Sequence, residues 1–156
     1  MHFDIIQIST HKIAKDDYIT HSDICEDELY LSESDWGGDE RTGDDVTYSL
    51  EGLKKAIKPF ATVNVKGKTI RFHEPEVVKR EWLKTVNANV EAFKKNLAEE
   101  RYPTAEFELY DDSRKLGVDV LFCNYYCMTL SRVIAEYLGG YIPQTLHIGA
   151  ILDAHR

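Results

Sequence analysis

The first apolar residues of the chain predict a strand that is buried on both sides. Residues 3–9 contain Ile5, Ile6 and Ile8, and β-branched side chains favour an extended backbone. Ile5 and Ile6 are adjacent, and adjacent residues of a strand point to opposite faces of the sheet. We therefore expect a central strand with both of its faces covered.

A short helix and a β-hairpin are predicted further along the chain. The helix is expected over residues 50–58, with Ser49 as its N-cap, because a serine hydroxyl can accept from an otherwise unpaired backbone N–H. Pro59 is expected to end it. Apolar and polar residues then alternate over residues 61–73, which predicts two short strands with Gly67 in the turn between them.

The strongest periodic pattern begins at Pro75, a residue that is favoured in the first turn of a helix. Apolar residues recur from there at spacings of three or four, which predicts one apolar stripe on a helix that ends near Arg101. A second helical stripe runs over residues 126–138 and is expected to end at the Gly139–Gly140 pair. The first stripe consists of Val78, Trp82, Val86, Val90, Phe93 and Leu97.

The remaining apolar runs complete an α+β pattern. Strands are expected over residues 28–32, 104–112 and 145–152, the last with a possible bulge at Gly149, and residues 118–124 form either a strand or an irregular lead-in. The chain of 156 residues has the common size of one domain. We predict a single α+β domain over residues 1–156, in which two long helices and one short helix pack on a mixed or mostly antiparallel sheet of five or six strands.

Composition narrows the classes of function. Apolar residues make up 43% of the chain, which is enough for one core, and the net charge is −8. That charge argues against direct binding to nucleic acid or to an anionic membrane. Three cysteines give no disulfide framework, and the first residues resemble neither a signal peptide nor a membrane anchor. We expect a cytoplasmic protein.

The negative charge is concentrated in residues 16–45, which we expect to be rich in loops. This segment holds twelve acidic residues and one base, Arg41, so its charge is −11 and the rest of the chain carries +3. Clustered carboxylates steer a cationic partner, and aromatic residues such as Trp36 and Tyr30 are typical interface anchors. A solvated loop that only adds solubility is the alternative. The candidate binding residues are Tyr30, Glu33, Asp35, Trp36, Asp39, Glu40, Asp44 and Asp45.

These observations favour a small, acidic, non-enzymatic binding protein of the inhibitor, immunity-partner or nucleic-acid-mimic type. Its partner would be a basic protein surface, for example that of a nucleic-acid-binding protein, and no cofactor is expected. The alternative is a metal-assisted hydrolase, in which His73, Asp111 and Asp112 would form an acid–base or metal cluster at neighbouring strand ends.

No specific metal site is expected elsewhere. Counted from Asp35, the third and twelfth positions of a calcium loop are Gly37 and Val46, where acidic ligands are required. A trio at His21, Asp23 and Cys25 is a weak zinc candidate without a fourth ligand. Cys123 and Cys127 would share one face of a helix, and core packing is the favoured interpretation for both.

Overall fold

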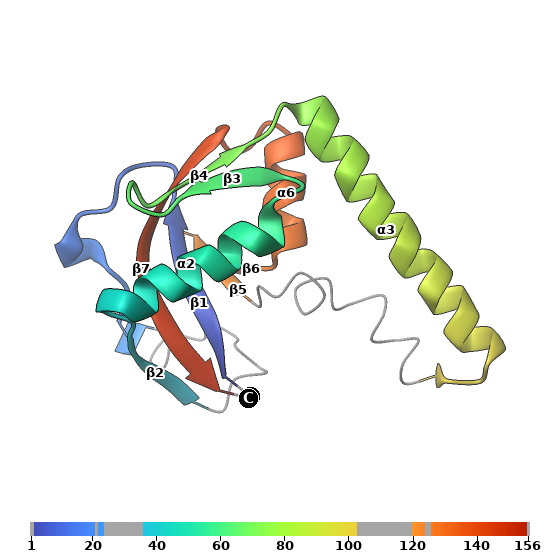
Figure 1. Ribbon diagram of the computed structural model, residues 1–156, viewed down its shortest axis with the longest axis horizontal. Helices are drawn as coiled ribbons and strands as arrows, with labels where there is room; N and C mark the ends of the chain where they lie inside the picture. The colour runs from blue at the N-terminus through green and yellow to red at the C-terminus, as the bar shows by residue number, and fades with distance from the viewer. Residues whose placement is uncertain (1, 21, 24–35, 103–119, 124–125, 156) are drawn as a thin grey trace.

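A β-sheet with helices around it forms the fold (Figure 1). The structure is a computed structural model, and it describes residues 2–20, 22–23, 36–102, 120–123 and 126–155. The predicted class, α+β, is confirmed. None of the helices in these ranges is long and apolar enough to cross a membrane.

The middle of the sheet contains two strands, one from each end of the chain. β1 (His2–Ser9) pairs antiparallel with β7 (Thr145–His155) and parallel with β5 (Val120–Cys123). Ile5 and Ile6 are 0% and 2% exposed although they point to opposite faces. The prediction of a central strand covered on both faces is therefore confirmed.

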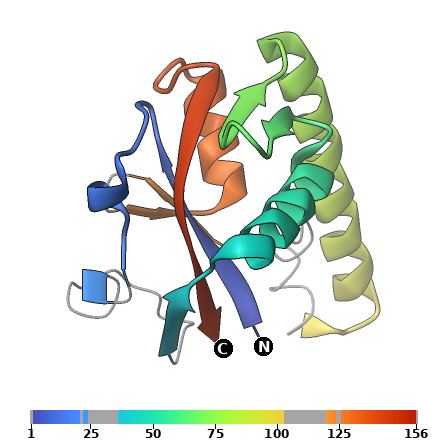
Figure 2. The same cartoon turned by 60° about the vertical axis from the view of Figure 1, so that its left-hand side comes forward.

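Within the described residues, the sheet has seven strands in the order β3-β4-β7-β1-β5-β6, with β2 also paired to β7. β4 pairs with the first residues of β7 and β2 with its last residues, so both use the edge of β7 that does not pair with β1. Figure 2 shows β4 beside one end of β7 and β2 beside the other. The prediction of five or six strands is wrong. The further strands are β2 (Trp36–Glu40), β3 (Ala61–Asn64), β4 (Thr69–Phe72) and β6 (Tyr126–Met128).

The helices differ in length from the prediction. α2 (Gly43–Ile57) begins seven residues before the predicted start, and Ser49 is a buried residue inside it rather than its N-cap. α6 (Leu130–Leu138) is shorter than predicted, because residues 126–128 form β6. Its start is fixed by Thr129, whose hydroxyl accepts a hydrogen bond from the Arg132 backbone N–H at 3.2 Å. A short 3-10 helix, η1, spans Lys15–Asp17.

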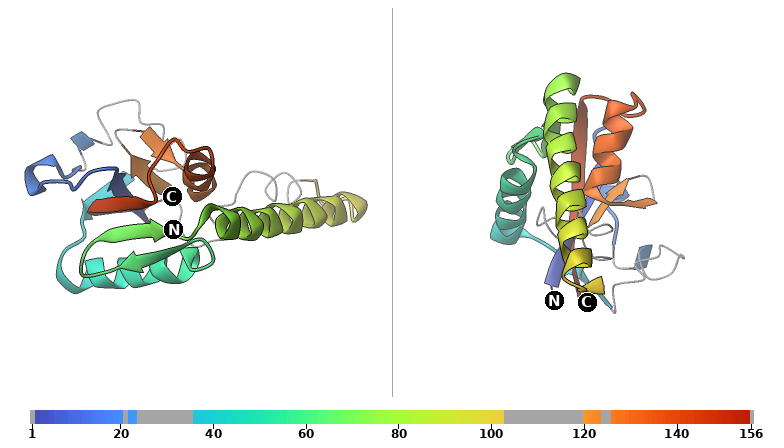
Figure 3. Two further views of the ribbon diagram at one scale, coloured as in Figure 1. Left: turned by 90° about the horizontal axis from the view of Figure 1, so that it is seen from above. Right: turned by 90° about the vertical axis from the view of Figure 1, so that its right-hand side faces the viewer.

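The long helix α3 (Pro75–Ala98) begins as predicted, but most of it leaves the sheet. Figure 1 and the left view of Figure 3 both show it starting near α6 and running outward. Val78 is fully buried in the core and Trp82 packs at the margin of the core, whereas Leu97 near the far end is 41% exposed. The predicted packing of this helix along the sheet is therefore wrong. The buried core is built instead from the sheet, α2, α6 and the first turn of α3.

Gln7, which lies opposite a bulge at Gly149, connects the segment that contains η1 to the sheet. The β1–β7 register shifts between Ile6 and Ile8, opposite Gly149, as predicted. The buried Gln7 amide fills the space, accepting from the backbone N–H groups of Ile19 at 3.2 Å and Ala150 at 3.0 Å. A Cβ atom at residue 149 would collide with the Gln7 amide, so a larger residue there would displace this hydrogen-bonded side chain.

Candidate functional site

The acidic segment has regular structure where it meets the sheet. Residues 36–40 form β2, and residues 43–45 are the first turn of α2, so the expectation of a loop is wrong for this part. The Arg41 backbone N–H continues the pairing with β7 by donating to the Ile151 carbonyl at 2.7 Å. Asp44 and Asp45 lie at the helix N-terminus, where the helix dipole stabilises negative charge.

Arg41 forms an inward-facing clamp. Asp4 and Asp153 are direct register partners on β1 and β7, and like charges at such positions repel. Arg41 bridges them, with Nε 2.9 Å from Asp4 Oδ1 and Nη2 3.0 Å from Asp153 Oδ1. Burial lowers the pKa of Arg41, but the hydrogen bond to Asp4 and the charges of Asp4, Asp153 and Asp45 raise it above its usual value overall. The side-chain hydrogen bonds of the guanidinium go to Asp4 and Asp153.

Three carboxylates and one aromatic ring face solvent beside the clamp. Glu40, Asp44 and Asp45 are exposed, and Tyr48 is 84% exposed. Tyr48 lies four residues after Asp44, so the two share one face of α2. We call these four residues the acidic corner. Arg41 is the only base in residues 16–45, and its two hydrogen-bonded ion pairs go to Asp4 and Asp153, whereas its charge also acts on Asp45 of the corner.

Sequence reasoning missed Tyr48, although the signal was present. Val46, Leu50, Leu53 and Ile57 recur at spacings of four, three and four, which predicts a helix longer than the one inferred from Ser49. That stripe faces the core, so Tyr48 falls on the outer side.

The eight predicted binding residues have different outcomes. Glu40, at the end of β2, and Asp44 and Asp45, in the first turn of α2, are exposed and belong to the acidic corner. Trp36 and Asp39 lie in β2. Tyr30, Glu33 and Asp35 lie outside the described residues, so their part in an interface stays a prediction.

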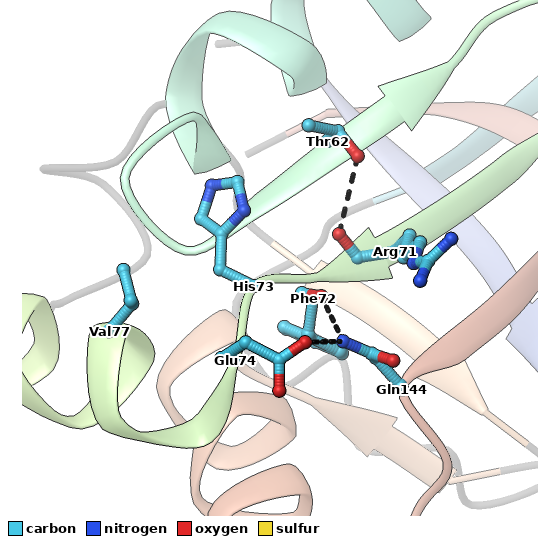
Figure 4. Close-up of a pocket in the computed structure, with 7 residues that line it drawn as sticks. All are labelled: Thr62, Arg71, Phe72, His73, Glu74, Val77 and Gln144. Atoms are coloured by element: carbon cyan, nitrogen blue, oxygen red, sulfur yellow. Dashed lines mark hydrogen bonds between the residues drawn. The ribbon is translucent and has the colours of Figure 1, made fainter.

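A second feature is a shallow hollow where β4 ends and α3 begins (Figure 4). Its volume is about 450 Å³. His73 belongs to its wall, and the Nε2–H group donates to the Lys58 carbonyl at 3.1 Å. The His73 carbonyl accepts from the Tyr137 hydroxyl at 2.9 Å, which ties this turn to α6. The hollow is lined by Thr62, Arg71, Phe72, His73, Glu74, Val77 and Gln144.

The predicted hydrolase cluster is not assembled from described residues. His73 lies in the hollow, but Asp111 and Asp112 fall outside the described ranges, so this cluster stays a prediction. Of the zinc trio, Asp23 accepts from the Thr20 backbone N–H and hydroxyl, while His21 and Cys25 are not described. Within the described part of the chain, no group of three His, Cys, Asp or Glu residues is placed to hold a metal.

The two cysteines near the C-terminal helix lie on strands. Cys123 is the last residue of β5 and Cys127 is in β6, where its register partner is Phe122. The expected shared helix face is therefore wrong, because both cysteines lie in strands rather than in a helix.

Comparisons with known proteins add no family. No protein-family model, no curated protein and no solved structure matches this chain. The acidic corner and the hollow are thus interpreted from their own residues and geometry.

Proposed function

We propose that this chain is a small non-enzymatic binding protein that engages a basic protein face through the acidic corner. The observation that carries this proposal is the inward pairing of Arg41 with Asp4 and Asp153. The base nearest to the corner in sequence therefore makes its ion-paired hydrogen bonds outside the corner, although its charge also acts on Asp45. Clustered carboxylates of this kind accelerate the approach of a cationic partner, such as the basic surface of a nucleic-acid-binding protein.

Tyr48 supplies the second element of an interface. Aromatic side chains with a polar end dominate the energetics of many protein interfaces. Tyr48 is 84% exposed on a regular helix, next to the carboxylate of Asp44 one turn earlier. A tyrosine side chain has only two torsion angles to fix on binding, which supports a role as the anchor of the contact.

The rigid setting of the corner also supports the proposal. β2 is hydrogen-bonded to β7, and the link to α2 is fixed by the Arg41 clamp. The backbone that carries the charged groups is therefore fixed before a partner arrives, and preorganisation lowers the cost of association. The odd number of cysteines supports a reducing, cytoplasmic setting for this function.

The test compares two variants with equal loss of charge. The corner variant carries Glu40→Gln, Asp44→Asn and Asp45→Asn. The control carries Glu76→Gln, Glu91→Gln and Glu100→Gln, three exposed positions at or beyond α3. Each is used as bait in extracts of the native host at low and at high salt, with quantitative mass spectrometry of the captured proteins.

A basic protein captured by the wild type and the control, but lost with the corner variant, is the expected result. Its direct binding is then measured with purified proteins. Equal capture by all three baits would show that the corner is not the interface.

A further inference from the structure

Arg71 differs from every other arginine in the described ranges. Five arginines are described, and four of them pair with a carboxylate. Arg71 is exposed, lines the hollow, and has no ion pair within the described part of the chain. A guanidinium presents a planar fork of donors that matches a carboxylate in a bidentate contact. One wall of the hollow thus offers an unoccupied carboxylate-binding group.

Glu74 and Gln144 form a second wall of the hollow, which presents hydrogen-bond acceptors. Gln144 Nε2 donates to the Phe72 carbonyl at 3.1 Å and to Glu74 Oε1 at 3.3 Å. These bonds orient the amide, so that its oxygen remains an acceptor, and they hold the Glu74 carboxylate at the rim. The Phe72 backbone N–H also donates to the Gln144 carbonyl at 2.9 Å, which fixes the two segments together. This wall offers acceptors only, which suits a cationic group.

The two walls face one hollow without neutralising each other. Arg71 and Glu74 are three residues apart and both line the hollow, yet they form no ion pair, so their charged atoms lie more than 4.0 Å apart. Figure 4 shows Arg71 on one side of Phe72 and Glu74 on the other. A volume of about 450 Å³ falls within the range of small-molecule sites. A ligand with a negative group at one end and a positive group at the other would pair with both Arg71 and Glu74.

We propose that this hollow binds a small zwitterion of the amino-acid or dipeptide class. Its carboxylate lies on Arg71, and its ammonium group lies on the Glu74 carboxylate. A simple anion is disfavoured by the Glu74 carboxylate, and a simple cation is disfavoured by Arg71. The Thr62 hydroxyl and the apolar Val77 side chain line the remaining space. The site shares no residue with the acidic corner, so its test is independent of the test of the proposed function.

The experiment is a titration of the isotope-labelled full chain with the dipeptide Ala-Ala, followed by NMR. Two matched probes lack one charge each, namely N-acetyl-Ala-Ala and Ala-Ala amide. Because exposed charge pairs give weak binding, the titration extends to about 10 mM. We expect amide shifts at residues 72–74, 76 and 77 and at Gln144 with Ala-Ala, and binding at least about tenfold weaker with either single-charge probe.

Variants separate the site from nonspecific charge effects. Arg71→Gln and Glu74→Gln are each expected to abolish the shifts, whereas Arg80→Gln and Glu76→Gln on α3 are expected to leave them unchanged. Thermal unfolding of every variant shows whether the fold is kept. The absence of shifts with Ala-Ala overturns the proposal. Equal shifts with N-acetyl-Ala-Ala overturn it as well, since they would indicate a site for anions in general.

Discussion

At the scale of single residues, Arg41 carries the most specific electrostatic role in the protein. Its clamp holds together two aspartates that oppose each other in register. Arg41→Ala leaves both carboxylates facing each other, so we expect a loss of about 1–2 kcal/mol in the free energy of unfolding, discounted for partial exposure. Urea denaturation measures this loss.

A partial rescue distinguishes repulsion from a simple loss of contacts. Adding Asp4→Asn to Arg41→Ala removes one of the two opposed charges, and stability is expected to recover in part. Arg80→Ala is the matched control, because its ion pair with Glu81 is exposed and contributes little. An Arg41→Ala variant as stable as Arg80→Ala would show that the clamp does not hold the corner.

Tyr137 predicts a dependence of stability on alkaline pH. Burial, followed by the charge of Glu74, raises its pKa above the usual value. The raised pKa means that its contribution is fully present below about pH 10 and is lost as the pH rises through the folded-state pKa. Tyr137→Phe is expected to cost about 0.5–1.5 kcal/mol near neutrality, because the hydrogen bond to the His73 carbonyl is lost.

The measurement is the urea midpoint of both proteins across neutral and alkaline pH. The difference between wild type and Tyr137→Phe should shrink above about pH 10. A difference that stays constant across that range would contradict the assigned titration.

At the scale of secondary-structure elements, local patterns predicted some boundaries and missed others. β1, the β3–β4 hairpin, the start of α3 and the bulge at Gly149 follow from patterns within a few residues, and all are present. The start of α2 was missed, because Ser49 fits a cap as well as a buried helical position. β2 was missed because "WGGDE" has no apolar alternation and becomes a strand only by pairing with β7.

The packing of α3 gives a prediction at this scale. Trp82 lies at the margin of the core, and its indole N–H is buried without an acceptor in the described part of the chain. Trp82→Ala is expected to cost about 2–3 kcal/mol, below the usual 3–5 kcal/mol for a fully buried aromatic residue. Trp82→Phe keeps a ring and removes the unpaired donor, so we expect a change within about 1 kcal/mol.

Chemical denaturation of the two variants decides the point. Leu83→Ala serves as the control, because Leu83 is the adjacent residue and is 44% exposed. If Trp82→Ala and Leu83→Ala unfold at the same midpoint, the second turn of α3 does not pack on the core as described.

At the scale of the whole molecule, the sequence predicted where charge is concentrated but not which charges face outward. The count of −11 over residues 16–45 is visible without a structure. The pairing of Arg41 with Asp153 joins residues 112 positions apart, and no local pattern indicates such a contact. The hollow also depends on a contact between residues distant in sequence, since Gln144, just before β7, lies 70 residues after Glu74 and donates to it. Long-range pairing of strands therefore determines both candidate sites.

We expect the charges of the acidic corner and the ring of Tyr48 to affect different rate constants of binding. Charges at the rim of an interface act at long range and are screened over about 8–10 Å at physiological salt, so they mainly affect association. Neutralising Glu40, Asp44 and Asp45 is expected to slow association with a basic partner and to flatten its salt dependence. Tyr48→Ala is expected to speed dissociation instead, because a packed aromatic ring acts only after the complex forms.

Surface plasmon resonance over a salt series, with the partner identified in the capture experiment, measures both rates. Stability provides the control. The loss of Asp44 and Asp45 from the first turn of α2 should cost about 0.3–1 kcal/mol each, and Tyr48→Ala should change stability by less than about 0.5 kcal/mol. These losses are too small to unfold the protein, so slower association can be assigned to the missing charge. If the triple variant associates at the wild-type rate at every salt concentration, the corner does not steer the partner, and its carboxylates only keep this end of the molecule solvated.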